Sequence, residues 1–209
     1  MEIEIRALTP ALEDEYFDFF DNRAFSDGSP YYPCYCNAFN MSAAAIGELR
    51  EQAKRYGGGT EGWKTALRES AADMVRAGRI RGYLAFDNGV AVGWCNANDR
   101  LDYCRIGEFD LDRLPDDSPP AGHLRRNQIK SIVCFEIGPG YRGKGIATML
   151  LDRVCADAKA EGYEFVEAYP TEHAQDSTAF TGPVRLYEKA GFTEFSREGA
   201  TIIMRKAVS

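Results

Sequence analysis

Long apolar runs are missing from this sequence of 209 residues. No stretch reaches the roughly eighteen apolar residues that a membrane-spanning helix needs, which excludes such a helix. An excess of basic residues is missing too, because 25 Lys and Arg stand against 32 Asp and Glu and give a net charge of −7. This balance argues against non-specific binding to nucleic acid and favours a cationic partner. Internal repeats are also absent, and 44% hydrophobic residues are ample for a core, so we expect one domain over residues 1–209.

The start of the chain lacks the apolar segment of a secretion signal. Residues 1–6 alternate charged side chains with isoleucines, which predicts a strand. The six cysteines are scattered, so we expect reduced thiols in a cytoplasmic protein. Four thiolates for zinc could come from Cys34, Cys36, Cys95 and Cys134. Their C-x-C spacing with isolated partners is not a zinc-ribbon pattern, so no metal is expected, and a cysteine nucleophile is the other alternative.

The spacing of apolar residues predicts an α+β fold. A helix that opens at Pro10, a second that Ser42 caps and a third that Thr60 caps precede a hairpin with an Asn-Gly turn at residues 88–89. The strand–helix–strand unit over residues 129–168 is expected to be parallel and right-handed. The predicted elements of the second half are strands at 129–137, 164–168, 192–196 and 201–205 and helices at 146–161 and 184–190.

A glycine-rich loop follows the predicted strand at 129–137. Residues 138–147 read GPGYRGKGIA and lead into a helix. A loop of this kind aims free backbone N–H groups and the positive end of the helix dipole at an anion. Arg142 and Lys144 add two cations, so we expect a phosphate group here. The alternative is an ordinary glycine-rich turn with solvated basic side chains.

Three phosphate-binding patterns compete for this loop. The dinucleotide pattern G-x-G-x-x-G fits its first three glycines, but the chain after residue 168 is too short for the parallel units of that fold. The P-loop pattern G-x-x-x-x-G-K fits residues 138–144, but Gly145 replaces the Ser or Thr that holds Mg²⁺. The pattern R/Q-x-x-G-x-G/A fits residues 142–147 in full.

This third pattern is the pyrophosphate-binding motif of the GNAT acyltransferase superfamily, which the sequence therefore resembles. Residues 186–192, LYEKAGF, resemble the L-Y-E-K-x-G-F signature of the same superfamily. Shorter phrases around Cys34, Trp94, Cys134 and Phe180 resemble a bacterial subgroup with no assigned substrate. The resemblance covers nearly the whole chain. It implies a mixed, mostly antiparallel sheet with helices on both faces and a central parallel βαβ unit.

The resemblance also implies a binding site for acetyl-CoA. The loop amides would hold the pyrophosphate, and the strand before the loop would bind the pantetheine arm through backbone groups left unpaired by the neighbouring strand. Alternation along this strand places Phe135 and Ile137 on one face. The residues expected to bind the cofactor are Val133, Phe135, Ile137, Arg142, Gly143, Lys144, Gly145, Ile146 and Ala147.

The chemistry implied by the resemblance is direct attack of a neutral amine on the acetyl thioester. Tyr187 matches the general acid that protonates the departing thiolate. Glu136 and Glu172 are two candidate bases, and alternation places Glu136 on the face opposite Phe135. The acceptor pocket is expected to include Tyr31, Tyr32 and Trp63.

The sequence therefore predicts an acetyl-CoA-dependent N-acetyltransferase. Its acceptor would be a small cationic amine or an amine of a protein, and a homodimer is compatible with the sequence. Neither nucleic acid nor a membrane is an expected partner. The alternatives are an acyl-CoA-binding sensor without catalysis and a nucleotide hydrolase, against which Gly145 argues.

Overall fold

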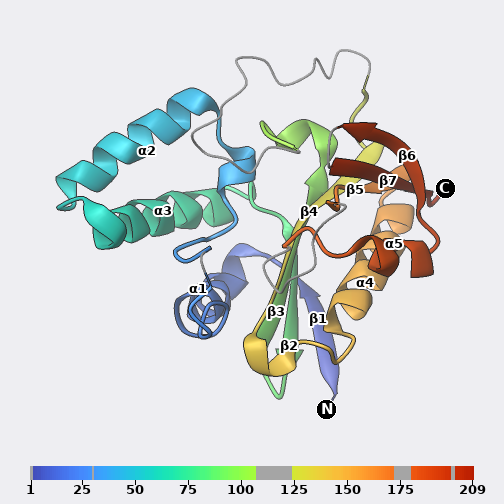
Figure 1. The fold of residues 1–209 in the computed structure, drawn as a ribbon, viewed down its shortest axis with the longest axis horizontal. Helices are drawn as coiled ribbons and strands as arrows, with labels where there is room; N and C mark the ends of the chain where they lie inside the picture. Colours follow the sequence, from blue (N-terminus) through green and yellow to red (C-terminus); the bar gives the residue numbers. More distant parts are fainter. Residues whose placement is uncertain (1, 30, 107–123, 172–179, 199–200) are drawn as a thin grey trace.

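The structure is a computed structural model that describes residues 2–29, 31–106, 124–171, 180–198 and 201–209 (Figure 1). The strands are β1 (Ile3–Ala7), β2 (Gly82–Asp87), β3 (Val90–Asp99), β4 (Ile129–Ile137), β5 (Phe165–Ala168), β6 (Thr193–Glu198) and β7 (Thr201–Ala207). The α-helices are α1 (Glu13–Asn22), α2 (Ala43–Arg55), α3 (Gly59–Arg76), α4 (Ile146–Ala160) and α5 (Val184–Lys189). None of the described helices is long and apolar enough to span a membrane.

Local sequence explains most of these boundaries. Ser42 caps α2 as predicted, because its side chain accepts a hydrogen bond from the N–H of Ala45 at 3.2 Å. The prediction that Thr60 caps α3 is wrong. This helix begins at Gly59 and its N-cap is Gly58, whose φ of +67° is a conformation that glycine adopts without steric cost. The Asn-Gly turn between β2 and β3 is confirmed, with both residues at positive φ.

Seven strands form a single sheet in the order β1-β2-β3-β4-β5-β7-β6. Every neighbouring pair is antiparallel except β4 and β5, which α4 connects. The α+β fold and the central parallel βαβ unit are therefore confirmed.

Helices cover both faces of the sheet, as predicted. In Figure 1, α1, α2 and α3 lie on one side of the strands and α4 and α5 lie on the other. Each side has its own buried cluster of apolar side chains, which we call the α1-side core and the α4-side core. Both faces of β4 are consequently buried, which agrees with the six apolar residues among its nine.

The strands β4 and β5 diverge halfway along β4. Their pairing runs from Ile129 opposite Phe165 to Ile132 opposite Ala168, where β5 ends. The remaining residues of β4, 133–137, have no strand partner on that side within the described chain. This divergence opens one edge of β4 next to the glycine-rich loop.

A β-bulge lies where the divergence begins. Asn96 pairs with Cys134 and Ala97 pairs with Ile132, so Val133 is an extra residue in β4. As a result Val133 and Cys134 both pack in the α1-side core, whereas Phe135 packs in the α4-side core. The bulge thereby sets which side chains of β4 face each side of the sheet.

Candidate functional site

The glycine-rich loop presents a row of backbone N–H groups at the start of α4. The N–H groups of residues 143–148 find no acceptor among the described residues, and the first helical bond is from Met149 to Gly145. Gly143 and Gly145 have φ of +73° and +83°, so other residues would be strained there. A Cβ built on either glycine meets no atom within 4 Å, so the space next to the amides is open. The backbone of the loop therefore offers the unpartnered N–H donors that an anion site would need.

The two cations of the loop point in different directions. Lys144 is exposed, and its Nζ lies 5.0 Å from the ring centre of Tyr141. Arg142 turns back from the loop: its Nε donates to the Ile137 carbonyl at 3.0 Å, and its terminal nitrogens contact Asp27 and Glu136. The Arg142 side chain thus bonds to Ile137, Asp27 and Glu136, and its expected contribution of a second cation to the loop stays a prediction. Lys144 remains beside the amides.

The open edge of β4 is partly occupied by the chain itself. Alternation is confirmed, since Phe135 and Ile137 both contact the α4-side core. The N–H of Phe135, however, donates to the Phe180 carbonyl at 2.6 Å. The expectation that this N–H lacks a partner is therefore wrong, because a segment beyond β5 returns to it. A ligand that uses the Phe135 N–H has to take the place of the Phe180 carbonyl.

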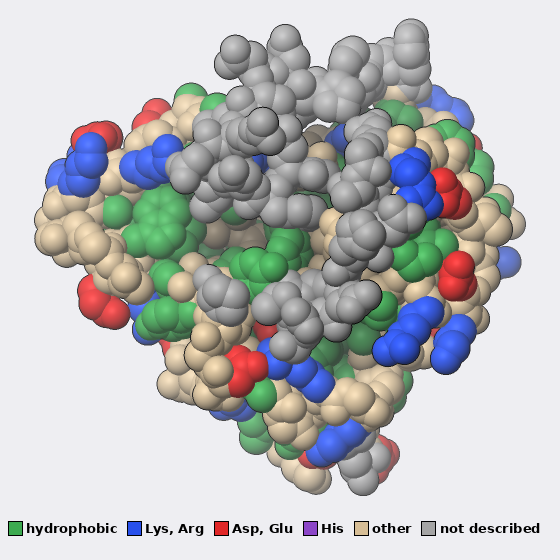
Figure 2. Space-filling view, viewed as in Figure 1, with side chains coloured by type: hydrophobic (Ala, Val, Ile, Leu, Met, Phe, Trp, Pro, Cys, Tyr) green, Lys and Arg blue, Asp and Glu red, His purple; other side chains and the backbone are tan. Residues whose placement is uncertain are grey.

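A cavity of about 670 Å³ lies on the α1 side of β4. Its walls come from α1, the loop 31–39, the first half of α3 and the end of β4. Tyr31, Tyr32 and Trp63 line it, as the sequence predicts for an acceptor pocket. Figure 2 shows hydrophobic side chains gathered on this face between the α2–α3 pair and the strands. The volume suits a small-molecule site, which is typically about 300–1,000 Å³.

Buried polar side chains hold the loop 31–39 against the sheet. The Asn96 side chain on β3 is fully buried, and it donates to the Cys36 carbonyl at 2.9 Å. The Tyr103 hydroxyl in turn donates to the Asn96 side-chain oxygen at 2.7 Å. Tyr16 of α1 donates to the Tyr35 carbonyl. These bonds fix the backbone of one cavity wall.

Replacing Asn96 by alanine is expected to lower the free energy of unfolding by about 2–4 kcal/mol. The change leaves the Cys36 carbonyl and the Tyr103 hydroxyl buried without their partner, and each such group costs about 1–3 kcal/mol. Urea denaturation measures the loss. Asn22→Ala, on the exposed end of α1, is the control and is expected to change stability by less than about 0.5 kcal/mol. Equal effects of the two substitutions would contradict this role of Asn96.

Glu136 projects from β4 toward the cavity, on the face opposite Phe135 as predicted. Its side chain is only 11% exposed. Burial raises the pKa of this carboxyl to about 7, although Arg142, 3.4 Å away, opposes the rise, while the nearby Asp27 adds to it. A carboxyl with this pKa is partly ionised at neutral pH and can accept a proton there. Glu172, the other candidate base, lies outside the described residues.

Tyr187 lies on the opposite side of β4 from Glu136. It is fully buried in the α4-side core, 6.4 Å from the Phe135 ring, and its hydroxyl donates to the Thr181 carbonyl at 2.5 Å. Burial raises the pKa of Tyr187 well above its usual value. The phenol therefore stays protonated, and it is a weaker acid than a free tyrosine. The two candidate proton-transfer groups flank the same stretch of strand.

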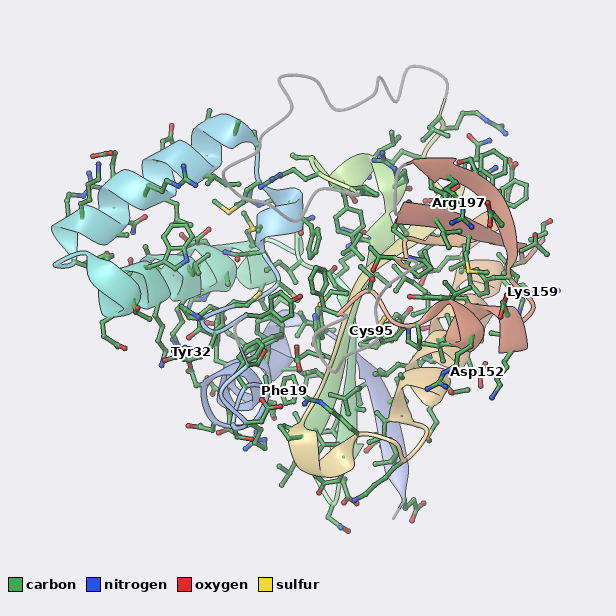
Figure 3. The ribbon with its side chains drawn as sticks, in the orientation of Figure 1. Phe19, Tyr32, Cys95, Asp152, Lys159 and Arg197 are labelled. Carbon is green, nitrogen blue, oxygen red and sulfur yellow. The ribbon has the colours of Figure 1, made fainter. Side chains whose placement is uncertain are left out.

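The four cysteines considered for zinc do not converge. Cys34, Cys36 and Cys134 line the cavity, with the sulfurs of Cys36 and Cys134 3.2 Å apart. Cys95 packs in the α4-side core, and Figure 3 places it on the α4 side of the strands and Tyr32 on the α1 side. All six cysteines are free thiols, as expected. The pKa of the Cys36 thiol is raised by its hydrogen bond with Cys134 and by burial, which disfavours the thiolate that a nucleophile needs.

Three residues of the site have no assigned role in the sequence-based prediction. Asp27 binds Arg142 from 115 positions away, Phe180 pairs with β4, and Arg105 lines the cavity. No spacing or motif connects them to the loop, because their proximity depends on the tertiary fold.

Comparison with known proteins agrees with this geometry. A model of the Acetyltransferase (GNAT) family matches residues 44–192. A GNAT-family acetyltransferase from Streptococcus pneumoniae has a similar structure, with a TM-score of 0.55, 17% sequence identity and full coverage of both chains. The PaiA N-acetyltransferase from Thermoplasma acidophilum, solved in complex with coenzyme A, has a TM-score of 0.54 at 17% identity over 99% of each chain.

A third similar structure is yncA, described as a putative acetyltransferase from Salmonella typhimurium with acetyl-CoA bound. Its TM-score is 0.52 at 13% identity, with coverage of 100% of this chain and 95% of that one. At these identities the structures support a shared fold. No curated protein matches the chain.

Proposed function

Because this chain belongs to the Acetyltransferase (GNAT) family and is therefore expected to transfer acyl groups, we propose that it moves the acetyl group of acetyl-CoA to an amine. The reaction takes place in a ternary complex, without a covalent enzyme intermediate. The observation that carries the proposal is the placement of two sites at one end of β4. The first of these sites is the row of unpartnered N–H groups at the start of α4. The second is the buried carboxyl of Glu136, which faces the cavity on the α1 side of β4.

The loop amides of residues 143–148 supply the binding site for the diphosphate of acetyl-CoA. They combine free N–H donors with the positive end of the α4 dipole, and Lys144 adds a cation. The edge of β4 at residues 133–137, which has no strand partner on the β5 side within the described chain, extends from this loop toward the β4–β5 divergence and would hold the pantetheine arm. Binding there exchanges the Phe180 carbonyl on the Phe135 N–H for an acceptor of the ligand.

Glu136 is the base in the proposed mechanism. An amine reaches the cavity mainly as ammonium, and it must lose a proton before its lone pair can attack the thioester. Glu136 takes that proton, and the amine nitrogen forms a bond to the acetyl carbon. The attacking nitrogen becomes positively charged and gives up its second proton to water. The carbon–sulfur bond of the thioester breaks, and the electron pair leaves with the sulfur as a thiolate.

Tyr187 acts on the departing sulfur from the other face of β4. Its protonated hydroxyl donates a hydrogen bond to the thiolate, which then takes up the proton released from the amine nitrogen through water. The raised pKa of Tyr187 favours the hydrogen-bonded state over complete transfer, so the gain is that of one hydrogen bond to an anion.

Tyr187→Phe is expected to lower kcat by about tenfold, the effect of losing one hydrogen bond to a charged group. The KM for acetyl-CoA should stay nearly unchanged, because the hydroxyl acts on the leaving group only. Steady-state release of CoA thiol measures both constants. Tyr56→Phe, on the exposed end of α2, is the control and should retain wild-type constants. A kcat equal to that of the wild type would remove Tyr187 from the mechanism.

The proposed activity is tested by CoA thiol release from acetyl-CoA in the presence of primary amines. Amine-dependent release together with acetylated amine in the product supports it. Acetyl-CoA binding without release for any amine would instead favour the non-catalytic sensor. Acetylation of the enzyme in the absence of an amine, detected by intact mass, would contradict direct attack.

A further inference from the structure

The rings around the cavity give it an apolar interior. Seven of its lining residues are aromatic: Phe20, Phe25, Tyr31, Tyr32, Phe39, Trp63 and Phe180. Several pack edge to face, such as Tyr31 with Phe180 at 5.0 Å and Phe25 with Tyr32 at 6.3 Å between ring centres. Such contacts fix the rings in place and leave a preformed apolar surface. A ligand that fills this space gains mainly from burial of its own apolar surface.

Charged groups are few among the described residues that line the cavity. Among the described residues that line it, Glu136 is the one carboxylate and Arg105 the one cation. Glu136 can pair with one ammonium group. A second ammonium group on the same ligand would enter an aromatic surface without a carboxylate, next to the buried Arg105 guanidinium, and burial of an unpaired charge is costly.

One aromatic wall residue of the cavity already has a cation beside it. The Lys64 ammonium lies 5.4 Å from the ring centre of Tyr32. The nearby Asp21 carboxylate contacts both Lys64 and Arg68. A polycation that approaches Tyr32 from this side meets Lys64 and Arg68, and the Asp21 carboxylate is already paired with both of them. The net charge of −7 is therefore not reflected in an excess of carboxylates beside Tyr32.

The volume argues against a narrow acceptor. The aliphatic stem of a lysine side chain occupies a small part of about 670 Å³, and the rings would be left without contacting atoms. We propose that the acceptor is a hydrophobic monoamine, a primary amine on an aromatic or equally bulky apolar group, rather than a polyamine or a protein lysine. This inference rests on the proposed acetyl transfer. Glu136 receives the ammonium, and the aromatic walls receive the apolar group.

A matched panel of amines tests the proposal by release of CoA thiol at saturating acetyl-CoA. The pair 2-phenylethylamine and ethylamine differs by one ring, and kcat/KM is expected to be at least about 30-fold higher for the ring-bearing amine. Spermidine and a lysine-containing peptide represent the other classes and are expected to react more slowly than 2-phenylethylamine. Equal rates for the matched pair, or preference for spermidine or the peptide, would overturn the hydrophobic monoamine while the acetyltransferase stands. Binding of acetyl-CoA without thiol release for any amine would overturn the proposed function itself.

A substitution in the cavity wall tests whether the cavity causes the preference for the ring-bearing amine. Trp63→Leu is expected to raise the KM for 2-phenylethylamine about tenfold, because a ring of the wall is lost, and to leave the KM for ethylamine and for acetyl-CoA unchanged. Phe195→Leu, on β6 and 59% exposed, removes an aromatic ring elsewhere and is expected to change none of the three constants. An equal rise of KM for both amines in Trp63→Leu would contradict a role for this ring in specificity. If Trp63→Leu does not fold, the matched pair on the wild type still decides the question.

Discussion

Replacing Glu136 by glutamine is expected to lower kcat by about 10³-fold at pH 8, within the range that a general base contributes. Glutamine keeps the size of the side chain and removes the group that accepts the proton of the amine. In the wild type kcat/KM should rise with pH through an apparent pKa of about 7, since the base must be ionised. In Glu136→Gln this rise should be absent, while the ionisation of the amine at higher pH remains.

The same substitution is expected to stabilise the fold at alkaline pH. The folded pKa of Glu136 is raised from its ordinary 4.5 to about 7, so the folded state binds this proton more tightly than the unfolded state does. Stability is therefore lost as pH rises from about 4.5 to 7, and the loss reaches about 3 kcal/mol above pH 7. Glu136→Gln does not lose stability in this way, because the glutamine side chain does not ionise. Its advantage in urea denaturation should be about 3 kcal/mol at pH 8 and should vanish toward pH 4.5.

Glu136→Gln is expected to lower kcat and to raise stability at alkaline pH. Because the two effects have opposite directions, a loss of activity with this stability gain cannot come from unfolding. Glu164→Gln, a partly exposed carboxyl that binds Arg125, is the control and should leave the pH profile of activity unchanged. An active Glu136→Gln enzyme with an unchanged pH profile would show that another group is the base. A variant that is inactive because it is unfolded would contradict the expected gain in stability.

Thr148→Glu is expected to weaken acetyl-CoA binding by about 10²-fold. Thr148 is exposed in the first turn of α4, beside the unpartnered amides. At an effective dielectric constant of about 20, like charges about 8 Å apart repel by about 2 kcal/mol, and a diphosphate carries two such charges before salt screens them. The helix itself should gain about 0.3–1 kcal/mol, because a carboxylate favours the positive end of the dipole. Calorimetric titration and thermal unfolding measure the two effects.

Thr148→Gln is the matched control, since it has the size of glutamate without the charge. It is expected to bind acetyl-CoA with nearly wild-type affinity. The difference between the two variants should shrink as the salt concentration rises. Equal affinities of Thr148→Glu and Thr148→Gln at low salt would place the diphosphate elsewhere.

Local patterns predict most of this fold from the sequence. The spacing of apolar residues gives β4 and α4 nearly to the residue, and the glycine-rich sequence of residues 138–147 predicts the loop between them. The cap at Ser42 and the Asn-Gly turn likewise depend on neighbouring residues alone. The start of α3 is predicted incorrectly, because three successive glycines offer several conformations and tertiary packing selects one.

The site is less predictable, because its parts meet only in the folded chain. Alternation places Glu136 on the correct face, but its raised pKa depends on a cavity built from α1, α3 and a distant loop. The direction of the Arg142 side chain depends on Asp27, and the bond from Phe135 depends on Phe180. Neither contact can be predicted from the periodicity of the nearby sequence. Tyr31, Tyr32 and Trp63 do line a cavity, and the family resemblance, not their spacing, points to them; their role toward an acceptor stays a prediction.

The binding of the diphosphate by the start of α4 is tested most directly by amide chemical shifts in a ¹⁵N-labelled protein titrated with CoA. The amides of residues 143–148 are expected to shift together and to saturate at the concentration at which calorimetry shows binding. The amides of α2, far from the loop, serve as the internal reference. Saturable binding of CoA that leaves the amides of residues 143–148 unshifted, or no binding at all, would contradict this account.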